Sequence, residues 1–491
     1  MTDRFFIDQH GCAKNQIDGE LIAGLLTGAG MVQTFSPEEA SLIIVNSCGF
    51  IESAKKESLD AVCSIRAAYP GAKILLAGCL AQRYASELEE SMPELDGIFG
   101  NGKLDSVVQV AERILRGERV KEIYAQEGVC AGARPVLFNY RGSAFVKITE
   151  GCSNHCSFCA IPLIRGELRS RTADDIADEI RQLVEGGIYE INLVGQDLAA
   201  YGTGAADNVF GDGRTALPVV DADGNNLGTA AESGLCRLLR RISGIPGDFT
   251  VRLLYIHPDH FNRDIIPVIK SDSRFLRYFD IPFQSGDDRI IRAMNRKGSA
   301  ASYIALAEML REELPGCVLR TTFLTGFPGE TSAEADNTCS FLKKLKSDWS
   351  GCFPYSREED TPAYSMKRRV SSREAERRAA ELGHIQSEIT AAALRKYVGT
   401  ETDVLVEEIV RADEGVTDGL AIGRAWFQAP EVDGNVVIRY ESELPAESEA
   451  VSPGNVVRVR ILAVAGVDLD ARFLSPVRTA CGGGRFKFLY E

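Results

Sequence analysis

Short apolar runs alternate with amphipathic stretches over the first 125 residues of the chain. The runs with the length and composition of buried strands are Phe5–Ile7, Leu42–Val45 and Ile74–Ala77. Between them, the spacing of apolar positions predicts helices over Asp18–Ala29 and Ser53–Ala67. Strands separated by helices form βαβ units, so residues 1–125 are predicted to fold as an α/β domain with a parallel sheet.

The same alternation returns over residues 144–398, after a predicted linker at 126–143 that contains Gly, Pro and Arg without a clear period. The predicted strands are Phe145–Thr149, Ile191–Val194, Val251–Tyr255, Tyr278–Ile281 and Val318–Leu324. The predicted helices lie near 174–185, 288–295, 301–313 and 332–346, and a longer one follows at 371–398. This pattern favours a full or partial (βα) barrel, interrupted at residues 202–234 by a Gly-, Asp- and Asn-rich surface excursion.

The last part of the chain changes to short β-rich runs separated by Gly, Pro, Asp and Asn. These runs are Asp403–Val410, Asn435–Tyr440 and Asn455–Ile461. Short strands at regular spacing are typical of a small barrel. We therefore expect a multidomain α/β protein that ends in a β-barrel at 399–478 and a tail at 479–491.

Composition narrows the class of protein. The chain has 491 residues, 45% hydrophobic and 25% charged, which excludes global disorder and collagen-like repeats. No apolar run approaches the roughly 18–20 residues of a membrane span, and the N-terminus lacks the pattern of a secretion signal. We expect a cytoplasmic protein with no membrane partner. The net charge of −15 disfavours bulk electrostatic binding to nucleic acid and favours a basic partner.

Cysteine is the residue type that indicates the chemistry. There are 13 cysteines and only five histidines, and clustered cysteines in a reducing compartment indicate metal or redox chemistry. Cys152, Cys156 and Cys159 form C-x3-C-x2-C directly after a predicted strand. Three thiolates on one loop can hold three irons of a 4Fe–4S cluster and leave the fourth open to a small molecule. Structural zinc is the alternative, but it needs a fourth ligand, and His155 lies inside the loop.

Three further cysteines share a second pattern. Cys12, Cys48 and Cys79 each follow a predicted strand, in the runs FFIDQHGC, LIIVNSC and ILLAGC. Because the carboxyl ends of parallel strands meet at one sheet edge, the three thiols are expected to converge. They could then bind a second cluster, again with one open iron. Taken singly, each cysteine has the ordinary explanation of a buried core residue.

The C-x3-C-x2-C motif, with Phe158 before its last cysteine, resembles that of radical S-adenosylmethionine (SAM) enzymes. More specifically, the chain resembles the methylthiotransferase family from Gly11 to about Ala363. The motifs concerned are GCAKNQIDGE, VNSCGFIESAKKES, AGCLAQRY, EGCSNHCSFCAIPLIRGELRSR, LVGQD, DIPFQSGDDRIIRAMNR, TTFLTGFPGET and YSREEDTPA. Beyond them, AIGRAWFQAPEVDG and SPGNVVRVRIL resemble the TRAM barrel of that family.

Within the family, the chain resembles the RimO type, which modifies an aspartate of the twelfth small-subunit ribosomal protein. Lys14-Asn15, Cys48–Ile51 and Ala429–Gly434 carry this resemblance. The MiaB type modifies a prenylated adenosine of tRNA and typically has a Gln-Met-Asn version of the first motif. Residues 401–491 hold 9 basic and 16 acidic residues, a net charge of −7, which would repel a phosphate backbone and attract a basic ribosomal protein. We expect acidic residues such as Glu407 and Glu408 to face that substrate.

The resemblance implies two 4Fe–4S clusters and SAM as cofactors. A 5′-deoxyadenosyl radical from SAM would remove hydrogen from the β-carbon of the aspartate, a sulfur species at the second cluster would join that carbon, and another SAM would supply the methyl group. An electron donor such as flavodoxin or ferredoxin and the iron–sulfur assembly machinery are expected partners. The residues expected to contact SAM are Phe158, Gln196, Asp197, Gln284 and Arg320.

Two other functions remain open at this point. One is a tRNA methylthiotransferase of the MiaB type. The other is a non-catalytic iron–sulfur or zinc protein that binds RNA through its terminal barrel. His257 and His260 could also bind a metal, although a turn at Pro258 is the simpler interpretation.

Overall fold

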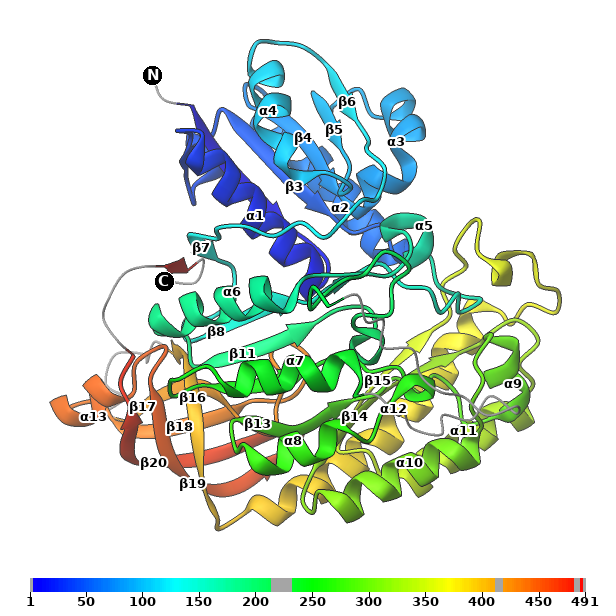
Figure 1. Ribbon diagram of the computed structural model, residues 1–491, viewed down its shortest axis with the longest axis vertical. Helices are drawn as coiled ribbons and strands as arrows, with labels where there is room; N and C mark the ends of the chain where they lie inside the picture. The colour runs from blue at the N-terminus through cyan, green and yellow to red at the C-terminus, as the bar shows by residue number, and fades with distance from the viewer. Residues whose placement is uncertain (1–2, 213–231, 411–417, 481–485, 489–491) are drawn as a thin grey trace.

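The computed structural model describes residues 3–212, 232–410, 418–480 and 486–488. Within these ranges the chain forms an N-terminal sheet, a central sheet and a C-terminal barrel (Figure 1). Most of the predicted tail and the centre of the predicted excursion, 213–231, lie outside the described residues. No helix in the described part of the chain is long and apolar enough to cross a membrane.

The N-terminal domain is built on a six-stranded parallel sheet with the order β2-β1-β3-β4-β5-β6. Its strands are β1 (Arg4–Gln9), β2 (Val32–Gln33), β3 (Leu42–Ser47), β4 (Lys73–Gly78), β5 (Gly97–Phe99) and β6 (Val120–Glu122). Its helices are α1 (Ala13–Gly28), α2 (Glu52–Ala68), α3 (Cys79–Ser91) and α4 (Val107–Leu115). Apolar side chains of β3 and β4 pack on both faces of the sheet, which explains why these strands read as continuous hydrophobic runs.

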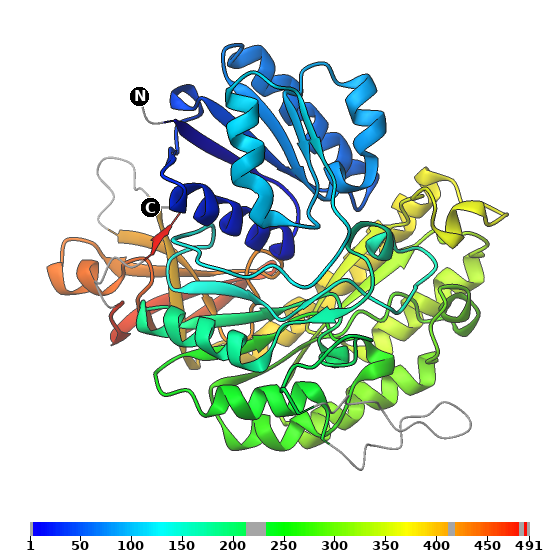
Figure 2. The ribbon, with the colours of Figure 1, turned by 45° about the horizontal axis from the view of Figure 1, so that its top comes forward.

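Helix α1 begins at Ala13, five residues before its predicted start at Asp18. The polar residues of its first turns, Lys14, Asn15 and Gln16, are buried. They are buried because α1 contacts both its own sheet and the central domain (Figure 2). A helix enclosed on both sides has no polar face, so the spacing of apolar residues could not mark its beginning.

The central domain is an open, all-parallel six-stranded sheet with the order β15-β14-β13-β12-β11-β8. Its strands are β8 (Ser143–Lys147), β11 (Glu190–Val194), β12 (Thr250–Leu253), β13 (Phe275–Asp280), β14 (Val318–Thr325) and β15 (Trp349–Pro354). The short strands β9 (Thr149–Glu150) and β10 (Arg169–Ser170) pair separately. Strand β15 was not predicted, because Ser, Gly and Pro interrupt its apolar pattern. The open sheet confirms the partial barrel.

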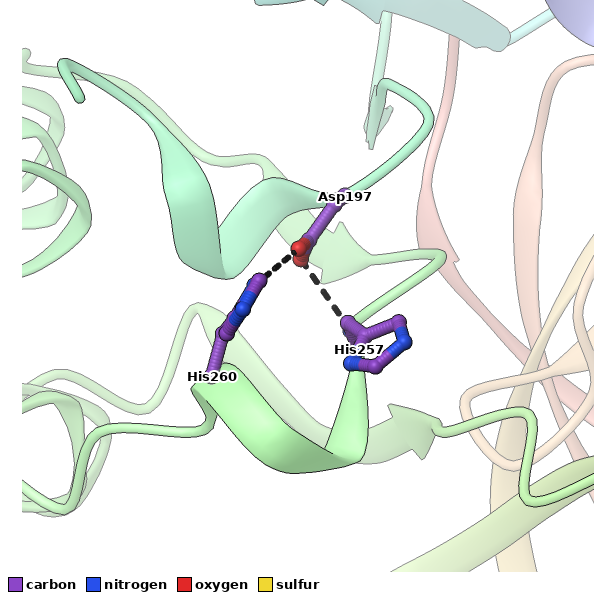
Figure 3. A group of neighbouring side chains, drawn as sticks. All are labelled: Asp197, His257 and His260. Carbon is purple, nitrogen blue, oxygen red and sulfur yellow. Dashed lines mark hydrogen bonds and ion pairs between the residues drawn. The ribbon is translucent and has the colours of Figure 1, made fainter. Parts of the chain in front are cut away.

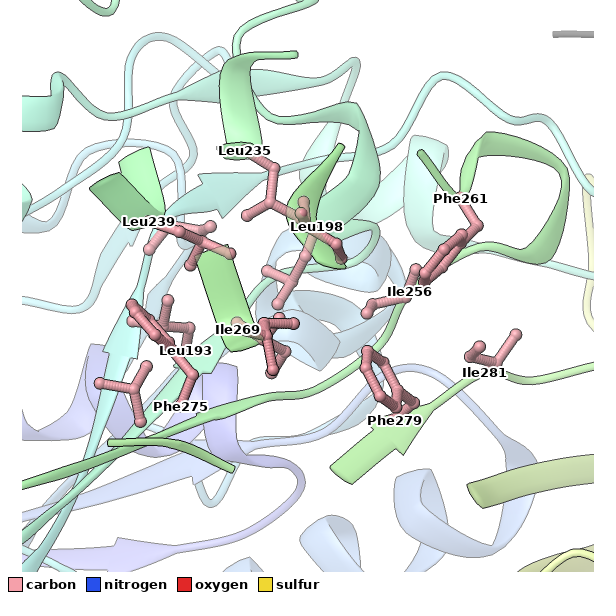
Figure 4. Packing of buried hydrophobic residues seen from close by; sticks show 14 of the residues in the cluster. Leu193, Leu198, Leu235, Leu239, Ile256, Phe261, Ile269, Phe275, Phe279 and Ile281 are labelled. Atoms are coloured by element: carbon pink, nitrogen blue, oxygen red, sulfur yellow. The ribbon is translucent and has the colours of Figure 1, made fainter. Parts of the chain in front are cut away.

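Helices cover one face of the central sheet. They are α6 (Ala173–Glu185), α7 (Gly234–Ser243), α8 (Ile265–Ser271), α9 (Asp288–Ala293), α10 (Ala300–Glu313), α11 (Ser332–Leu345) and α12 (Ser372–Leu394). The short α5 (Ile161–Arg165), after the cysteine loop, instead contacts α3 of the N-terminal domain. Figure 4 shows part of the core beneath them, where Leu193 of β11, Leu239 of α7 and Ile269 of α8 belong to one apolar cluster. This layer holds the strand ends, and therefore the loops beyond them, in fixed positions.

The C-terminal domain is a closed five-stranded barrel with the order β16-β17-β18-β20-β19. Its elements are β16 (Glu401–Val410), β17 (Asp418–Ala425), β18 (Val436–Glu441), α13 (Pro445–Ala450), β19 (Val456–Ala465) and β20 (Asp468–Arg478). It packs against the central domain, where Trp349 Nε1 donates to the Phe427 carbonyl at 2.8 Å. The predicted fold class is confirmed.

Buried charges join the barrel to the central sheet. Glu190 of β11 accepts hydrogen bonds from Arg252 at 2.8 Å and from Arg424 of the barrel at 2.7 Å. Arg424 also pairs with Glu407 at 2.7 Å. The expectation that Glu407 faces a substrate is therefore wrong, since its side chain is buried in this network, whereas the adjacent Glu408 is exposed.

The segment at 126–143 is also tied into the fold. Within it, β7 (Val136–Leu137) pairs in parallel with β21 (Lys487–Phe488) near the end of the chain. Arg134 is buried and forms ion pairs with Glu20 of α1 and Glu179 of α6. The segment thus clamps the N-terminal domain to the central domain.

Candidate active site between two cysteine sets

Three cysteines lie at one edge of the N-terminal sheet. Cys12 follows β1 and is the N-cap of α1, Cys48 follows β3, and Cys79 follows β4 as the first residue of α3. Strands β1, β3 and β4 are direct neighbours, so their carboxyl ends gather thiols that are 35 and 30 intervening residues apart. We call these residues the N-terminal cysteine set. Every cysteine in the described ranges is free of disulfides.

Glycines beside these cysteines allow the three loops to approach closely. A Cβ atom at Gly11 would lie 3.1 Å from Cys48 Cβ, and one at Gly49 would lie 2.7 Å from the Cys79 carbonyl oxygen. Gly11 also has a φ of +92°, a conformation that favours glycine. Close packing of the loops therefore requires the glycines that stand next to the thiols.

The thiols of the N-terminal set differ in their electrostatics. Burial, together with the nearby thiol of Cys79, raises the pKa of Cys48 to about 12. Loss of water also opposes ionisation of Cys12, but the charges of Lys14 and Arg165, together with backbone hydrogen bonds, outweigh it and lower the pKa of that thiol. The Cys12 thiol also raises the pKa of both Cys48 and Cys79. A bound iron–sulfur cluster would fit this set of three gathered thiols, because its irons take thiolate ligands.

The second group, the core cysteine set, is formed by Cys152, Cys156 and Cys159. Its loop reverses direction at His155, which has a φ of +48° and whose carbonyl accepts a hydrogen bond from Asn295 Nδ2 at 2.9 Å. The Cys159 N–H donates to the Cys156 carbonyl at 3.0 Å, so these two thiols lie on one turn. Burial raises the pKa of Cys152 and that of Cys159 to about 12. The loop offers three thiols within eight residues.

Helix α9 anchors the core loop. Ser157 Oγ donates to the Ala293 carbonyl at 2.8 Å, and the Ser157 N–H donates to the Met294 carbonyl at 3.1 Å. The Phe158 ring packs against a small apolar cluster that includes Ile290 and Met294. The end of α9 therefore sets the position of the core set.

Asp197 contacts the same loop and also two histidines, which Figure 3 shows beside it. Its Oδ2 accepts from Asn154 Nδ2 at 3.1 Å and lies 2.6 Å from His260 Nδ1, and its Oδ1 accepts from the His257 N–H at 3.1 Å. Burial opposes ionisation of Asp197, but the hydrogen bond and charge of His260 hold its pKa well below the usual range. Because Asn154 lies inside the cysteine motif, Asp197 positions that loop.

The two histidines lie on the predicted turn, the 3-10 turn Pro258–His260. Ligand atoms of His257, His260 and Asp197 lie within 4.8 Å of one another. Burial lowers the pKa of His257 to about 3, so that ring is neutral. Asp197 contacts the His260 ring but only the backbone N–H of His257. The His257 Nδ1 accepts from the Asp259 N–H at 3.3 Å, and its buried Nε2 has no partner among the described residues.

Two further residues expected to contact SAM, Gln196 and Gln284, differ in their hydrogen bonding and backbone conformation. Gln196 Nε2 donates to Glu150 Oε1 at 3.4 Å, while its buried Oε1 has no partner among the described residues. Gln284 has a φ of +70° and its backbone pairs with β14. Such a conformation in a non-glycine residue often marks a functional site.

Arg320 lies near the beginning of β14, close to the barrel. Its Nη1 donates to Asp280 Oδ1 at 3.3 Å, and its Nε lies 3.4 Å from Asp433 Oδ1 of the barrel. The contacts of Arg320 thus join the central sheet to the C-terminal domain.

One buried arginine connects the two cysteine sets. Arg165 ends helix α5, six residues after Cys159, and its Nη2 donates to Cys79 Sγ at 3.1 Å. On the same short helix, Ile164 packs against Cys79. The loop that carries the core set therefore also forms one wall of the N-terminal set.

Four buried charges balance at this contact. Arg165 pairs with Asp18 at 2.9 Å and with Glu150 at 2.8 Å, and Lys147 contacts the same two carboxylates at 2.6 Å each. Sequence reasoning missed this network, because single charged residues inside a motif look like surface residues. The available signal was that Asp18 and Arg165 stand within motifs that carry the family resemblance.

A second bridge lies on the other side of the N-terminal set. Buried Glu358 accepts hydrogen bonds from Arg83 at 2.7 Å and from Lys55 at 3.1 Å. Arg83 also donates to the Gly49 carbonyl at 3.0 Å, beside Cys48. Ion pairs thus hold the N-terminal set against the central domain from two directions.

Comparison with known proteins agrees with this architecture. Three family models match in order: Uncharacterized protein family UPF0004 at residues 4–100, the Radical SAM superfamily at 146–342 and the TRAM domain at 398–474. A protein of Treponema denticola named ribosomal protein uS12 methylthiotransferase RimO is 49% identical over 95% of this chain and 99% of its own length. The chain belongs to this family. A relative of the same name from Carboxydothermus hydrogenoformans is 36% identical over 96% of this chain and 100% of its own length.

Membership makes the chain a radical SAM methylthiotransferase, an enzyme class that uses an iron–sulfur cluster and SAM. The predicted family and enzyme class are confirmed. Among solved structures, the radical SAM methyltransferase TsrM from Kitasatospora setae, with cobalamin and a 4Fe–4S cluster bound, has a TM-score of 0.50 at 13% identity. The match covers 74% of this chain and 77% of that chain, and it shows a shared fold.

Proposed function

We propose that this enzyme attaches a methylthio group to the β-carbon of an aspartate in ribosomal protein uS12, using SAM and two 4Fe–4S clusters. The observation that carries the substrate is the 49% identity to the Treponema denticola relative over nearly the whole of both chains. The proposal of two clusters rests on two separate sets of three thiols, all free of disulfides.

In this proposal, the cysteine sets hold the clusters and the surrounding residues fix their separation. When bound, the cluster of the core set would supply the electron that splits SAM, and that of the N-terminal set would hold the sulfur to be transferred. Arg165 would stabilise the thiolate of Cys79 by a charge-assisted hydrogen bond. Because its other contacts are buried carboxylates, the guanidinium cannot move away without leaving those charges unpaired.

We divide the residues expected to act on SAM into two groups. Phe158, Gln196 and Gln284 are proposed to contact it directly, since Gln196 has an unpaired buried oxygen and Gln284 a strained backbone. Asp197 is proposed to act as a positioning residue, because Asn154 and His260 already occupy its carboxylate. Arg320 is proposed to act in the same way, because ion pairs with Asp280 and Asp433 hold its guanidinium.

The proposed partners follow from the same chemistry. The substrate protein would be basic and the C-terminal barrel is acidic, so exposed carboxylates such as that of Glu408 would favour their approach. An electron donor such as flavodoxin or ferredoxin would reduce the core cluster, and iron–sulfur assembly machinery would load both. This chemistry belongs in the cytoplasm, where ribosomal proteins are made.

The decisive experiment is an anaerobic reaction of cluster-loaded enzyme with SAM, dithionite and either uS12 or tRNA, analysed by mass spectrometry. We expect a mass gain of one methylthio group on a uS12 aspartate and none on tRNA. Modification of tRNA with no change in uS12 would contradict the proposal. The absence of both products, together with iron for one cluster or none, would favour a non-catalytic iron–sulfur protein.

A further inference from the structure

Lys14 is a buried cation that contacts no carboxylate in the described part of the chain. The residue is 7% exposed. Its Nζ donates to the Gly195 carbonyl at 3.3 Å and lies 3.5 Å from the centroid of the Tyr255 ring. The neighbouring cations Lys147 and Arg165 each contact two carboxylates. The ammonium group has three donors and these contacts supply one hydrogen-bond acceptor, so no carboxylate of the described residues balances its charge.

The position of this charge is between the two cysteine sets. Lys14 stands two residues after Cys12, and its side chain reaches from α1 into the central domain. Gly195 and Tyr255 follow β11 and β12, next to the loop ends that support the core set. The charge therefore lies beside the N-terminal set, at the contact between α1 and the strand ends of the central sheet.

Tyr255 is itself unusual. It has a φ of +67°, a conformation that costs free energy in a bulky residue. Its N–H donates to Asp280 at 3.3 Å, and its half-buried ring presents one face to Lys14. The strained backbone thus holds an aromatic face that supports a cation.

We propose that Lys14 binds the carboxylate of the side chain that the enzyme modifies. This inference rests on the proposed function. A buried cation without a counter-charge is unfavourable, and an incoming carboxylate would relieve that cost through a charge-assisted hydrogen bond. The carboxylate of aspartate is bonded directly to its β-carbon, so fixing the carboxylate also fixes the carbon that reacts. Lys14 thereby selects an acidic side chain.

The test measures binding of two peptides to the cluster-loaded enzyme without oxygen. Both carry the uS12 sequence around the modified position, one with Asp and one with Asn. Fluorescence anisotropy gives each Kd for the wild type, Lys14→Met, Lys14→Gln and Lys14→Arg. The matched control is Lys103→Met, because Lys103 is an exposed lysine over the Tyr124 ring, at 5.7 Å.

We expect the wild type and Lys103→Met to bind the Asp peptide about 10- to 100-fold more tightly than the Asn peptide. Lys14→Met and Lys14→Gln should lose this preference, while Lys14→Arg should keep part of it. Iron content and the electron paramagnetic resonance spectrum of each variant are recorded in parallel. If Lys14→Met loses iron, Lys14→Gln, which can still donate to Gly195, decides the comparison.

Several results would overturn the inference. One is an equal affinity of the wild type for both peptides, which needs no variant to observe. Another is an intact preference in Lys14→Met together with a shifted spectrum of the N-terminal cluster, because Lys14 would then be a counter-charge of that cluster. If the wild type modifies the Asp peptide and the preference survives in both variants, only the inference fails. If the wild type neither binds nor modifies uS12, the proposed function fails and the inference fails with it.

Discussion

The two cysteine sets are assembled in opposite ways. The core set lies on one loop of eight residues, so its thiols are neighbours in the sequence. The N-terminal set comes from the ends of three strands, and only the parallel order of β1, β3 and β4 brings its thiols together. A local motif can form before the domain folds, whereas a distributed set exists only in the folded domain.

The supports of the two sets differ as well. Arg165, a permanent cation, contacts the N-terminal set directly. The core set is held through Asn154 by an ion pair between Asp197 and His260, and a histidine can lose its charge near neutral pH. Both sets therefore depend on the fold, but a fixed charge supports the N-terminal set, whereas long-range hydrogen bonds and a titratable charge support the core set.

The largest expected effect is the loss of one whole cluster. Fully loaded enzyme should hold about eight irons, and replacing either cysteine set by Ala should leave about four. The variant without the core set should form no 5′-deoxyadenosine, whereas the variant without the N-terminal set should still cleave SAM but form no methylthio product. Iron analysis and chromatography of the products check this. Cys63→Ala, which removes an exposed thiol on α2, is the control. Full iron content in either triple variant would disprove that assignment.

The next effect concerns the contact between the sets. Arg165→Met leaves Asp18 and Glu150 with Lys147 as their shared cation, and breaking a buried ion pair costs about 3–5 kcal/mol of folding free energy. We expect a lower melting temperature and loss of iron from the N-terminal set first. Arg181→Met removes an exposed pair with Asp178 and should change neither. Equal loss of iron from both sets would mean that Arg165 supports the whole fold and not one set.

A smaller effect is expected at Asp197, and it concerns the core set instead of the N-terminal set. Asp197→Ala removes the acceptor of Asn154 and His260, a loss of at most about 1–3 kcal/mol for each of these half-buried partners. The core set should lose iron and SAM should bind more weakly, while the N-terminal set keeps its iron. Electron paramagnetic resonance and equilibrium dialysis with SAM measure the two changes. Weaker SAM binding at full iron content would instead make Asp197 a direct contact.

The smallest effect is a pH dependence of the core set alone. Burial opposes protonation of His260, but its hydrogen bond to Asp197 wins and raises the pKa above 6.5. A raised pKa in the folded state means that this stabilisation is complete below pH 6.5 and is lost as the pH rises through the raised value. Iron retention by the core set should therefore fall at alkaline pH, and His260→Gln should remove that dependence. A similar fall in the N-terminal set would show that the cause lies elsewhere.

Much of the architecture could be predicted from apolar patterning. The central strands of both sheets were predicted because residues buried on both faces leave long apolar runs. The apolar pattern missed strand β15, because Ser, Gly and Pro interrupt it. It also missed the beginning of α1, because the buried residues there are polar. Glu407 was placed on the surface because sequence alone cannot show that Arg424 pairs with it.

Cysteine spacing, glycine neighbours and motif order can be read along the chain, and they were enough to predict the chemistry. Which charges meet depends on the folded molecule. Lys14, Arg165 and Asp197 look alike in sequence as polar residues near motifs, yet one is unpaired, one joins the two sets and one holds a loop. The physical reason is that the pairing of a buried charge depends on groups brought from distant parts of the chain, such as Cys79 to Arg165.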